Sequence, residues 1–312
     1  MAELSMREAY GRALAEYGAA NSRVVVLDPD TSSSTLSSFF AKRFPERFFN
    51  IGIAEPCMID VAVGLALDGK IPFANGFAAL LALRAMEQIR TAVCYAKTNV
   101  KIAASYAGLS DYKDGPTHHA ITDIALMRAL PNMQVIVPAD SAEVANWVPI
   151  VAECRGPVYL RISRAATLPV HDPSVKLELG RGLTLREGKD VSILCAGAMV
   201  GRSLLAAQEL DREGISARVL EIHTIKPLDV DLIEQAAKET GAIVTAEEHS
   251  IVGGLGGAVC EALCAQHPVP VERVGIADTF VRTAPDPESL MDAFGLAVVD
   301  IVSAAKRAMS RK

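Results

Sequence analysis

The chain has 312 residues, of which 50% are hydrophobic and 22% are charged, the composition of a compact globular protein rather than a disordered or fibrous one. Its length predicts two domains. The formal net charge of -6 argues against a surface for nucleic acid or anionic membranes, although a small basic pocket for an anionic substrate remains compatible with it.

Six cysteines are scattered through apolar stretches. None belongs to a Cys-x-x-Cys pair, and no histidine stands at a metal-ligand spacing from any of them, so we expect reduced cysteines in the core and no metal site on this chain. The N-terminal segment 1–16 has no signal-peptide core, and no apolar run is long enough to cross a bilayer. These features predict a cytoplasmic protein.

The first half of the chain alternates short β-branched runs with longer helical patterns. Ser5 and Glu8 have the spacing of a capping box, which predicts a helix that continues to Tyr17. Strands are expected at 24–27, 100–104, 134–137 and 158–162, and helices near 82–95, 121–130 and 141–153. Such alternation predicts a parallel sheet with helices on both faces.

A polar stretch rich in turn-forming residues interrupts this pattern at 165–190. A second α/β series follows. Its strands are expected at 191–194, 218–222, 242–245 and 271–275, and a closing helix at about 297–309. We therefore divide the chain into a first domain at 1–168, a linker at 169–188 and a smaller α/β domain at 189–312.

Polar residues of the first domain gather in the loops that follow strands, where ligands bind in open parallel sheets. Glu55 lies in one such loop, between a short apolar run and an apolar helix. A carboxylate there can be a favourable first-turn charge and nothing more. The apolar surroundings favour instead a carboxyl group that shares a proton with a ligand.

The densest polar cluster of the chain is Lys113-Asp114-Gly115-Pro116-Thr117-His118-His119. It is compatible with an Asp-Gly turn, a helix start and two surface histidines. Alternatively, one histidine points into a cleft and donates a hydrogen bond or moves a proton, while Asp114 orients a substrate hydroxyl.

Two motifs of the second domain are weaker indicators of function. The glycine run at 252–257 lacks the Walker lysine and the order of a dinucleotide fingerprint, so it predicts close packing of a helix start. Glu247-Glu248-His249 is interpreted either as a carboxylate-histidine pair or, equally well, as a solvated cluster at the domain interface.

Together, the Glu55 segment and the loop Asp114-Gly115-Pro116-Thr117-His118 resemble the C-terminal half of transketolase, and the likeness extends over nearly the whole chain. Four further segments are similar: Ala129-Leu130-Pro131-Asn132, Val137-Pro138-Ala139-Asp140, Glu247-Glu248-His249 and Asp278-Thr279-Phe280. The resemblance implies a parallel-sheet pyrimidine-binding domain for thiamine diphosphate, followed by the smaller transketolase C-terminal domain. It implies transfer of a two-carbon ketol unit from a phosphorylated or otherwise anionic ketose to an aldose.

The resemblance also implies which residues contact the cofactor. Glu55 would activate thiamine diphosphate by hydrogen-bonding a ring nitrogen of its aminopyrimidine, and Asp30 would lie near the thiazolium ring. Leu80 stands where the family has the phenylalanine that stacks on the pyrimidine, which leaves Phe77 as the nearest aromatic candidate.

For the substrate, the resemblance places Asp114 and His118 against hydroxyl groups of the donor sugar, with His118 as a catalytic residue. Arg7, Ser34 and Arg164 occupy positions that bind the sugar phosphate, a role that suits arginine. Ordinary surface solvation is the alternative for both arginines.

Three departures from the family pattern concern the substrate end of the pocket. Tyr106 stands in place of a phosphate-contacting histidine, Asp111-Tyr112-Lys113 replaces Val-Gly-Glu, and His119 replaces a glutamine. We therefore expect Tyr106 and Lys113 to contact the substrate and the specificity to be altered.

The family's Gly-Asp-Gly segment, which binds magnesium and the diphosphate, has no counterpart in the sequence. We therefore expect a partner subunit that carries the diphosphate-binding domain and the magnesium ligands, in a two-plus-two heterotetramer whose sites lie between chains. A 2-oxoacid dehydrogenase β subunit, a fragment of deoxyxylulose-phosphate synthase and a non-catalytic regulatory subunit remain as alternatives. The loop at 114–118 favours transketolase, and Glu55 argues against a silent subunit.

Overall fold

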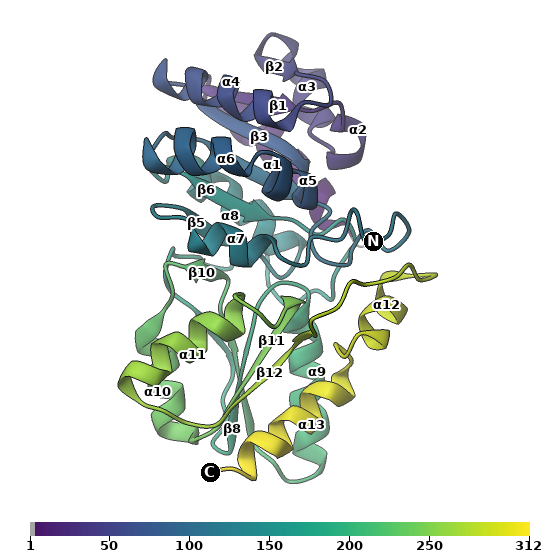
Figure 1. Ribbon diagram of the computed structural model, residues 1–312, viewed down its shortest axis with the longest axis vertical. Helices are drawn as coiled ribbons and strands as arrows, with labels where there is room; N and C mark the ends of the chain where they lie inside the picture. Colours follow the sequence, from purple (N-terminus) through teal and green to yellow (C-terminus); the bar gives the residue numbers. More distant parts are fainter. Residues whose placement is uncertain (1–3) are drawn as a thin grey trace.

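The first domain is built on a seven-stranded sheet with strand order β10-β5-β6-β4-β3-β1-β2. The computed structural model describes residues 4–312 (Figure 1). The six strands from the first half of the chain are all parallel. Parallel sheets have helices on both faces, and accordingly β1 and β4 are buried along their whole length. These strands are β1 Val24–Asp28, β2 Phe48–Asn50, β3 Ile71–Phe77, β4 Lys101–Ser105, β5 Gln134–Ile136 and β6 Val158–Arg161.

Helices cover both faces of this sheet. One face packs on α1 and α8 around Tyr10 and Trp147, and the other on α4, α5 and α7. The expected helix at 82–95 is divided into three segments, and Ser5 precedes α1 without a side-chain capping bond. The helices are α1 Met6–Ala20, α2 Ser32–Thr35, α3 Ser38–Arg43, the 3-10 turn Pro45–Arg47, α4 Glu55–Leu67, α5 Ala78–Arg84, α6 Met86–Gln88, the π-helix Ile89–Tyr95, α7 Asp123–Ala129 and α8 Ser141–Glu153.

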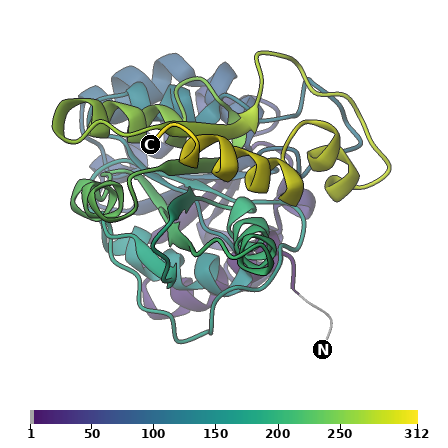
Figure 2. The ribbon, with the colours of Figure 1, turned by 90° about the horizontal axis from the view of Figure 1, so that it is seen from below.

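The second domain has a five-stranded sheet of order β12-β11-β8-β9-β7 between two pairs of helices. Helices α9 and α13 pack together, as do α10 and α11 (Figures 1 and 2). Strand β7 lies inside the range 169–188 expected as a linker, and it pairs antiparallel with β9. The elements are β7 Leu183–Arg186, β8 Val191–Cys195, α9 Met199–Arg212, β9 Ala217–Glu221, α10 Val230–Thr240, β11 Ile243–Ser250, α11 Leu255–Gln266, β12 Val271–Ile276, α12 Pro287–Ala293 and α13 Val298–Met309.

A short strand from the second half of the chain completes the first sheet. β10, Thr224–Lys226, pairs antiparallel with β5, and its Lys226 Nζ donates to the carbonyls of Arg128 and Leu130 at 3.0 and 2.6 Å. The second half of the chain therefore supplies an edge strand to the sheet of the first domain.

The expectation of a solvated cluster at Glu247-Glu248-His249 is wrong, because all three side chains are buried. Glu247 accepts hydrogen bonds from the first backbone N–H groups of α11, and a Cβ at Gly254 would lie 2.0 Å from its carboxylate. Glu248 reaches the first domain, where its Oε1 accepts from the Leu109 N–H at 2.7 Å. Burial is tolerated because Glu247 accepts two hydrogen bonds, and Glu248 accepts one and lies 3.8 Å from Arg161 Nη1.

The cysteines are all free thiols, but not all belong to the core. Cys94 and Cys195 are buried as expected, whereas Cys57 and Cys264 are exposed. Within the part of the chain that the structure describes, no helix is both long and apolar enough to span a membrane.

Candidate active site

Glu55 begins α4, and Pro56 occupies the next position, where its fixed φ suits the first helical turn. The carboxylate is only 3% exposed. Its Oε1 accepts a hydrogen bond from Arg84 Nη1 at 3.1 Å, and the Arg84 side chain is 51% exposed. A half-exposed ion pair is screened by solvent and weak. The carboxylate thus lies just beneath the surface, with a partner that a ligand can replace.

Four of the residues assigned to the cofactor or the substrate meet around Tyr106, directly after β4. Arg7 Nη1 donates to the Tyr106 hydroxyl at 2.9 Å and to the Ser34 carbonyl at 2.8 Å. The Tyr106 ring lies 4.3 Å from that of Phe77, centroid to centroid. Tyr106 has a φ of 60°, a conformation that residues with a Cβ seldom adopt outside functional sites. The carboxyl end of β3 and the segments that follow β1 and β4 therefore meet at Tyr106.

Arg164 and His118 border the same group. The Arg164 guanidinium lies 5.0 Å from the Tyr106 ring centroid, and its Nη1 is 2.7 Å from Asp111 Oδ1. The His118 ring meets Phe77 edge-on at 6.1 Å. Two guanidinium groups beside one phenol give this edge of the sheet a positive potential that suits an anionic group.

Asp111 is the acidic member of this group, and sequence reasoning treated it only as a departure from the family pattern. Its side chain is fully buried. Burial, together with the negative charge of Asp114, raises the pKa of Asp111 to about 6, and Arg164 opposes the rise. The Asp111 carbonyl also contacts His119 Nε2 at 3.1 Å. Asp111 therefore links Arg164 to the loop that carries Asp114 and His119.

Several predicted residues lie outside the group around Tyr106. Asp30 is exposed and accepts a hydrogen bond from Asn50 at 2.9 Å. Leu80 is half-buried on α5. Lys113 and Asp114 are exposed, and Lys113 Nζ lies 5.3 Å from the centroid of the adjacent Tyr112 ring.

Sequence reasoning missed Arg84, the ion-pair partner of Glu55, because 29 residues separate the two. It also missed Asp28, whose buried carboxylate shapes the loop after β1 by accepting from the hydroxyls of Thr35 and Ser37 at 3.0 and 2.9 Å. Burial raises the pKa of Asp28. An acidic residue ending a fully apolar strand was the available signal for Asp28.

The comparison with known proteins covers both domains. The family model of the transketolase pyrimidine binding domain matches residues 2–169, and that of the transketolase C-terminal domain matches residues 180–301. The putative transketolase C-terminal section of Methanocaldococcus jannaschii is 44% identical over 307 residues, which cover 97% of this chain and 95% of that protein. The 6-deoxy-6-sulfo-D-fructose transketolase subunit SqwH of a Clostridium species is 40% identical and covers 98% of this chain and 95% of its own.

A solved structure described as a split gene transketolase, inactive beta4 tetramer, superposes with a TM-score of 0.93 at 50% identity, covering 99% of each chain. The chain belongs to the transketolase family, whose members use thiamine diphosphate. Within that family it is a subunit of a split transketolase, the one that carries the pyrimidine-binding and C-terminal domains.

Proposed function

We propose that this chain supplies the cofactor-activating glutamate and the substrate-binding edge of a transketolase whose diphosphate-binding domain, with its magnesium ligands, is on a partner subunit. The observation that carries the proposal is the buried carboxylate of Glu55 at the start of α4. By the resemblance to transketolase, Glu55 occupies the position of the glutamate that activates the cofactor.

The residues at this edge fit the aminopyrimidine half of thiamine diphosphate. Glu55 offers a carboxylate that is shielded from water and can form a hydrogen bond to a ring nitrogen. Phe77 and Leu80 are half-buried and offer apolar contact, and Asp30 is exposed in the loop that follows β1. When bound, the cofactor supplies the nucleophile and the electron sink for ketol transfer. Glu55 would bind the ring in one orientation and protonation state.

For the donor sugar, we assign the anionic group to Arg7, Arg164 and the residues that meet them at Tyr106. The Arg7 guanidinium donates to the Tyr106 hydroxyl, and the Arg164 guanidinium lies 5.0 Å from the Tyr106 ring centroid. Asp114 and His118 would then meet sugar hydroxyls, and Lys113 would add positive charge. Because one 40% identical relative is a 6-deoxy-6-sulfo-D-fructose transketolase subunit, a sulfonated ketose joins phosphorylated ketoses as a candidate donor.

The partner subunit would cover the face that carries Glu55. Large apolar side chains are exposed on adjacent elements there: Ile53 is 77% exposed, Leu67 76%, Leu83 60% and Tyr95 83%. Exposed apolar side chains concentrated in one region mark interaction surfaces. A partner seated on this face would enclose Glu55 and Arg84, and a two-plus-two assembly in the cytoplasm would place each site between chains.

Complementation tests this proposal. The chain alone, the diphosphate-binding partner alone and their equimolar mixture are assayed with thiamine diphosphate and magnesium, using xylulose 5-phosphate, fructose 6-phosphate and 6-deoxy-6-sulfofructose as donors. Ketol transfer by the mixture only is expected. Transfer by the chain alone would disprove the split site, and decarboxylation of a 2-oxoacid without ketol transfer would favour a 2-oxoacid dehydrogenase β subunit. A mixture that assembles without catalysing either reaction would indicate a regulatory subunit.

A further inference from the structure

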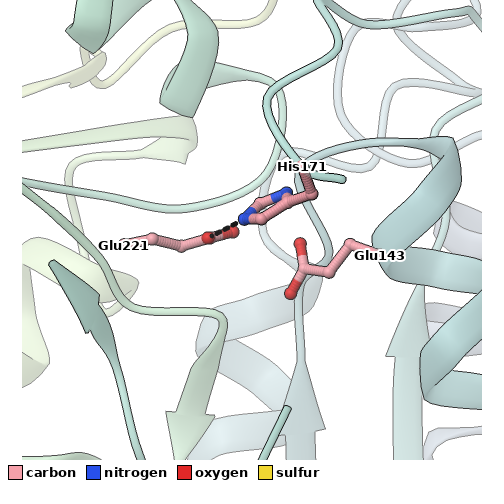
Figure 3. A group of neighbouring side chains, drawn as sticks. All are labelled: Glu143, His171 and Glu221. Carbon is pink, nitrogen blue, oxygen red and sulfur yellow. Dashed lines mark ion pairs between the residues drawn. The ribbon is translucent and has the colours of Figure 1, made fainter. Parts of the chain in front are cut away.

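A second group of ionisable side chains lies at the junction of the two domains, within the protein interior and outside the candidate active site. Glu143 lies on α8 of the first domain, His171 on the connecting segment, and Glu221 at the end of β9 in the second domain (Figure 3). One ligand atom from each of the three lies within 4.8 Å of the others. We propose that these residues, with His223, form a structural binding site for a divalent transition-metal ion, zinc in particular, that fastens the two domains together.

His171 is oriented as a ligand by its other ring nitrogen. Its Nδ1 lies 3.1 Å from Asp140 Oδ2, and Asp140 in turn accepts backbone hydrogen bonds from Val170 and His171 at 2.8 Å each. Nε2 therefore faces Glu221, whose Oε2 is 2.8 Å away. A carboxylate that holds the far nitrogen of an imidazole is the usual outer support of metal-binding histidines.

The polar atoms of the group differ in how far the protein satisfies them, and Glu143 is the best satisfied, since its carboxylate accepts from Trp147 Nε1 and from the Ala139 N–H. Glu221 Oε1 and both ring nitrogens of His223 are buried without a hydrogen bond, Glu221 Oε2 has only the contact with His171 Nε2, and both side chains are 0% exposed. His223 faces the group, with its Nδ1 3.4 Å from Glu143 Oε1. Buried polar groups are nearly always paired in native proteins, and buried carboxylates need a compensating positive charge. A divalent cation satisfies both requirements at once.

The donor set and its spacing match zinc. Two imidazoles and two carboxylates form a tetrahedral set with no open position, as in structural zinc sites. With metal-ligand bonds of about 2.0 to 2.1 Å, tetrahedral ligand atoms stand roughly 3.3 Å apart. Two of the pairs described above are 2.8 and 3.4 Å apart, and the ligand atoms of Glu143, His171 and Glu221 all lie within 4.8 Å of one another, so side chains would have to move by up to about 1.5 Å to reach this spacing.

Metal binding would fix the position of one domain relative to the other, because the ligands come from both domains. His223 directly precedes β10, the strand that completes the sheet of the first domain. Trp147, on the same helix as Glu143, donates from Nε1 to Glu143 Oε1 at 2.9 Å. A bound cation would thus join α8 and the β9–β10 connection, and hold the domains in one arrangement.

The test uses the full chain, stripped of metal with a chelator and then dialysed against zinc. We expect about one tightly held zinc ion per chain, by elemental analysis, and a thermal midpoint higher than that of the stripped chain. His171→Gln and Glu221→Gln should each reduce the retained zinc at least tenfold. His267→Gln, which changes a histidine at the end of α11, is the matched control and should retain zinc fully.

A measurement on the unmutated chain guards against variants that fail to fold. Loaded with Co²⁺, the wild-type chain should show the intense visible bands of a four-coordinate centre. A wild-type chain that holds no zinc, because the carboxylates share a proton instead, would overturn the proposal. So would zinc retained equally by the three variants, or the weak bands of a six-coordinate surface complex.

Discussion

Replacing Gly108 by alanine should weaken the contact between Glu248 of the second domain and the loop of the first domain that follows Tyr106. Gly108 has a φ of +60°, and a Cβ there would lie 2.3 Å from the Glu248 carboxyl carbon. Glu248 cannot move without losing the 2.7 Å hydrogen bond from the Leu109 N–H. A left-handed alanine costs about 1 kcal/mol, and loss of a hydrogen bond to a buried charged group costs roughly 1.5 to 3 kcal/mol. The expected destabilisation is therefore about 2.5 to 4 kcal/mol.

Gly214→Ala is the matched control, because Gly214 has a φ of +79° and nothing within 4 Å of the added Cβ. That variant should lose only about 1 kcal/mol, the cost of the backbone conformation. The measurement is urea unfolding followed by the fluorescence of Trp147, the single tryptophan of the chain, which is fully buried. Equal destabilisation of the two variants would refute the steric reasoning.

Three further predictions concern the surface, the titration of the site and the thiols. Leu67→Asp should prevent assembly with the partner subunit, whereas Val299→Asp, at a position in the second domain that is 65% exposed against 76% for Leu67, should not. Size-exclusion chromatography compares them, and normal assembly of both would place the interface elsewhere. Because the pKa of Asp111 is raised in the folded chain to about 6, the folded state holds that proton more tightly than the unfolded state. The contribution of Asp111 to stability should therefore fall as pH rises from roughly 4 to roughly 6. Asp111→Asn should remove this slope from the urea data, and an unchanged slope would contradict the assignment. In the native chain, Cys57 should react with a thiol reagent at once, and Cys195 only after unfolding, since Cys195 is buried and burial raises its pKa. Rapid reaction of both would contradict the burial of Cys195.

The sequence predicts those parts of the fold that have strong periodicity. The runs at 24–27 and 158–162 are strands that are buried on both faces of a parallel sheet, and such strands are predominantly apolar, with Arg161 as the charged exception. β10 was not predicted, since a three-residue strand has no detectable period and forms only when β5 accepts it. The helix expected at 82–95 is divided, and its backbone changes to a π-helix at 89–95. The pattern of apolar residues continues across these changes, so the sequence did not indicate them.

The candidate active site was predictable where a motif carries it, and not where distant residues meet. Glu55 and Tyr106 stand at the ends of apolar runs and could be selected from the sequence. The alternative that placed Glu248 in a solvated cluster at the domain interface is wrong about solvation, because charged runs are usually exposed and its partner Leu109 is 139 residues away. The group of Glu143, His171 and Glu221 comes from three elements, so no local spacing indicates it.

Glu55→Gln in the reconstituted complex tests the central claim most directly, because glutamine keeps the size of the side chain and removes the carboxylate. Assembly should be unchanged, since Glu55 forms only one half-exposed ion pair. Ketol transfer should fall by at least about a hundredfold, the contribution typical of a catalytic proton-holding group. A complex that assembles and transfers ketol units at the wild-type rate would contradict the role of Glu55.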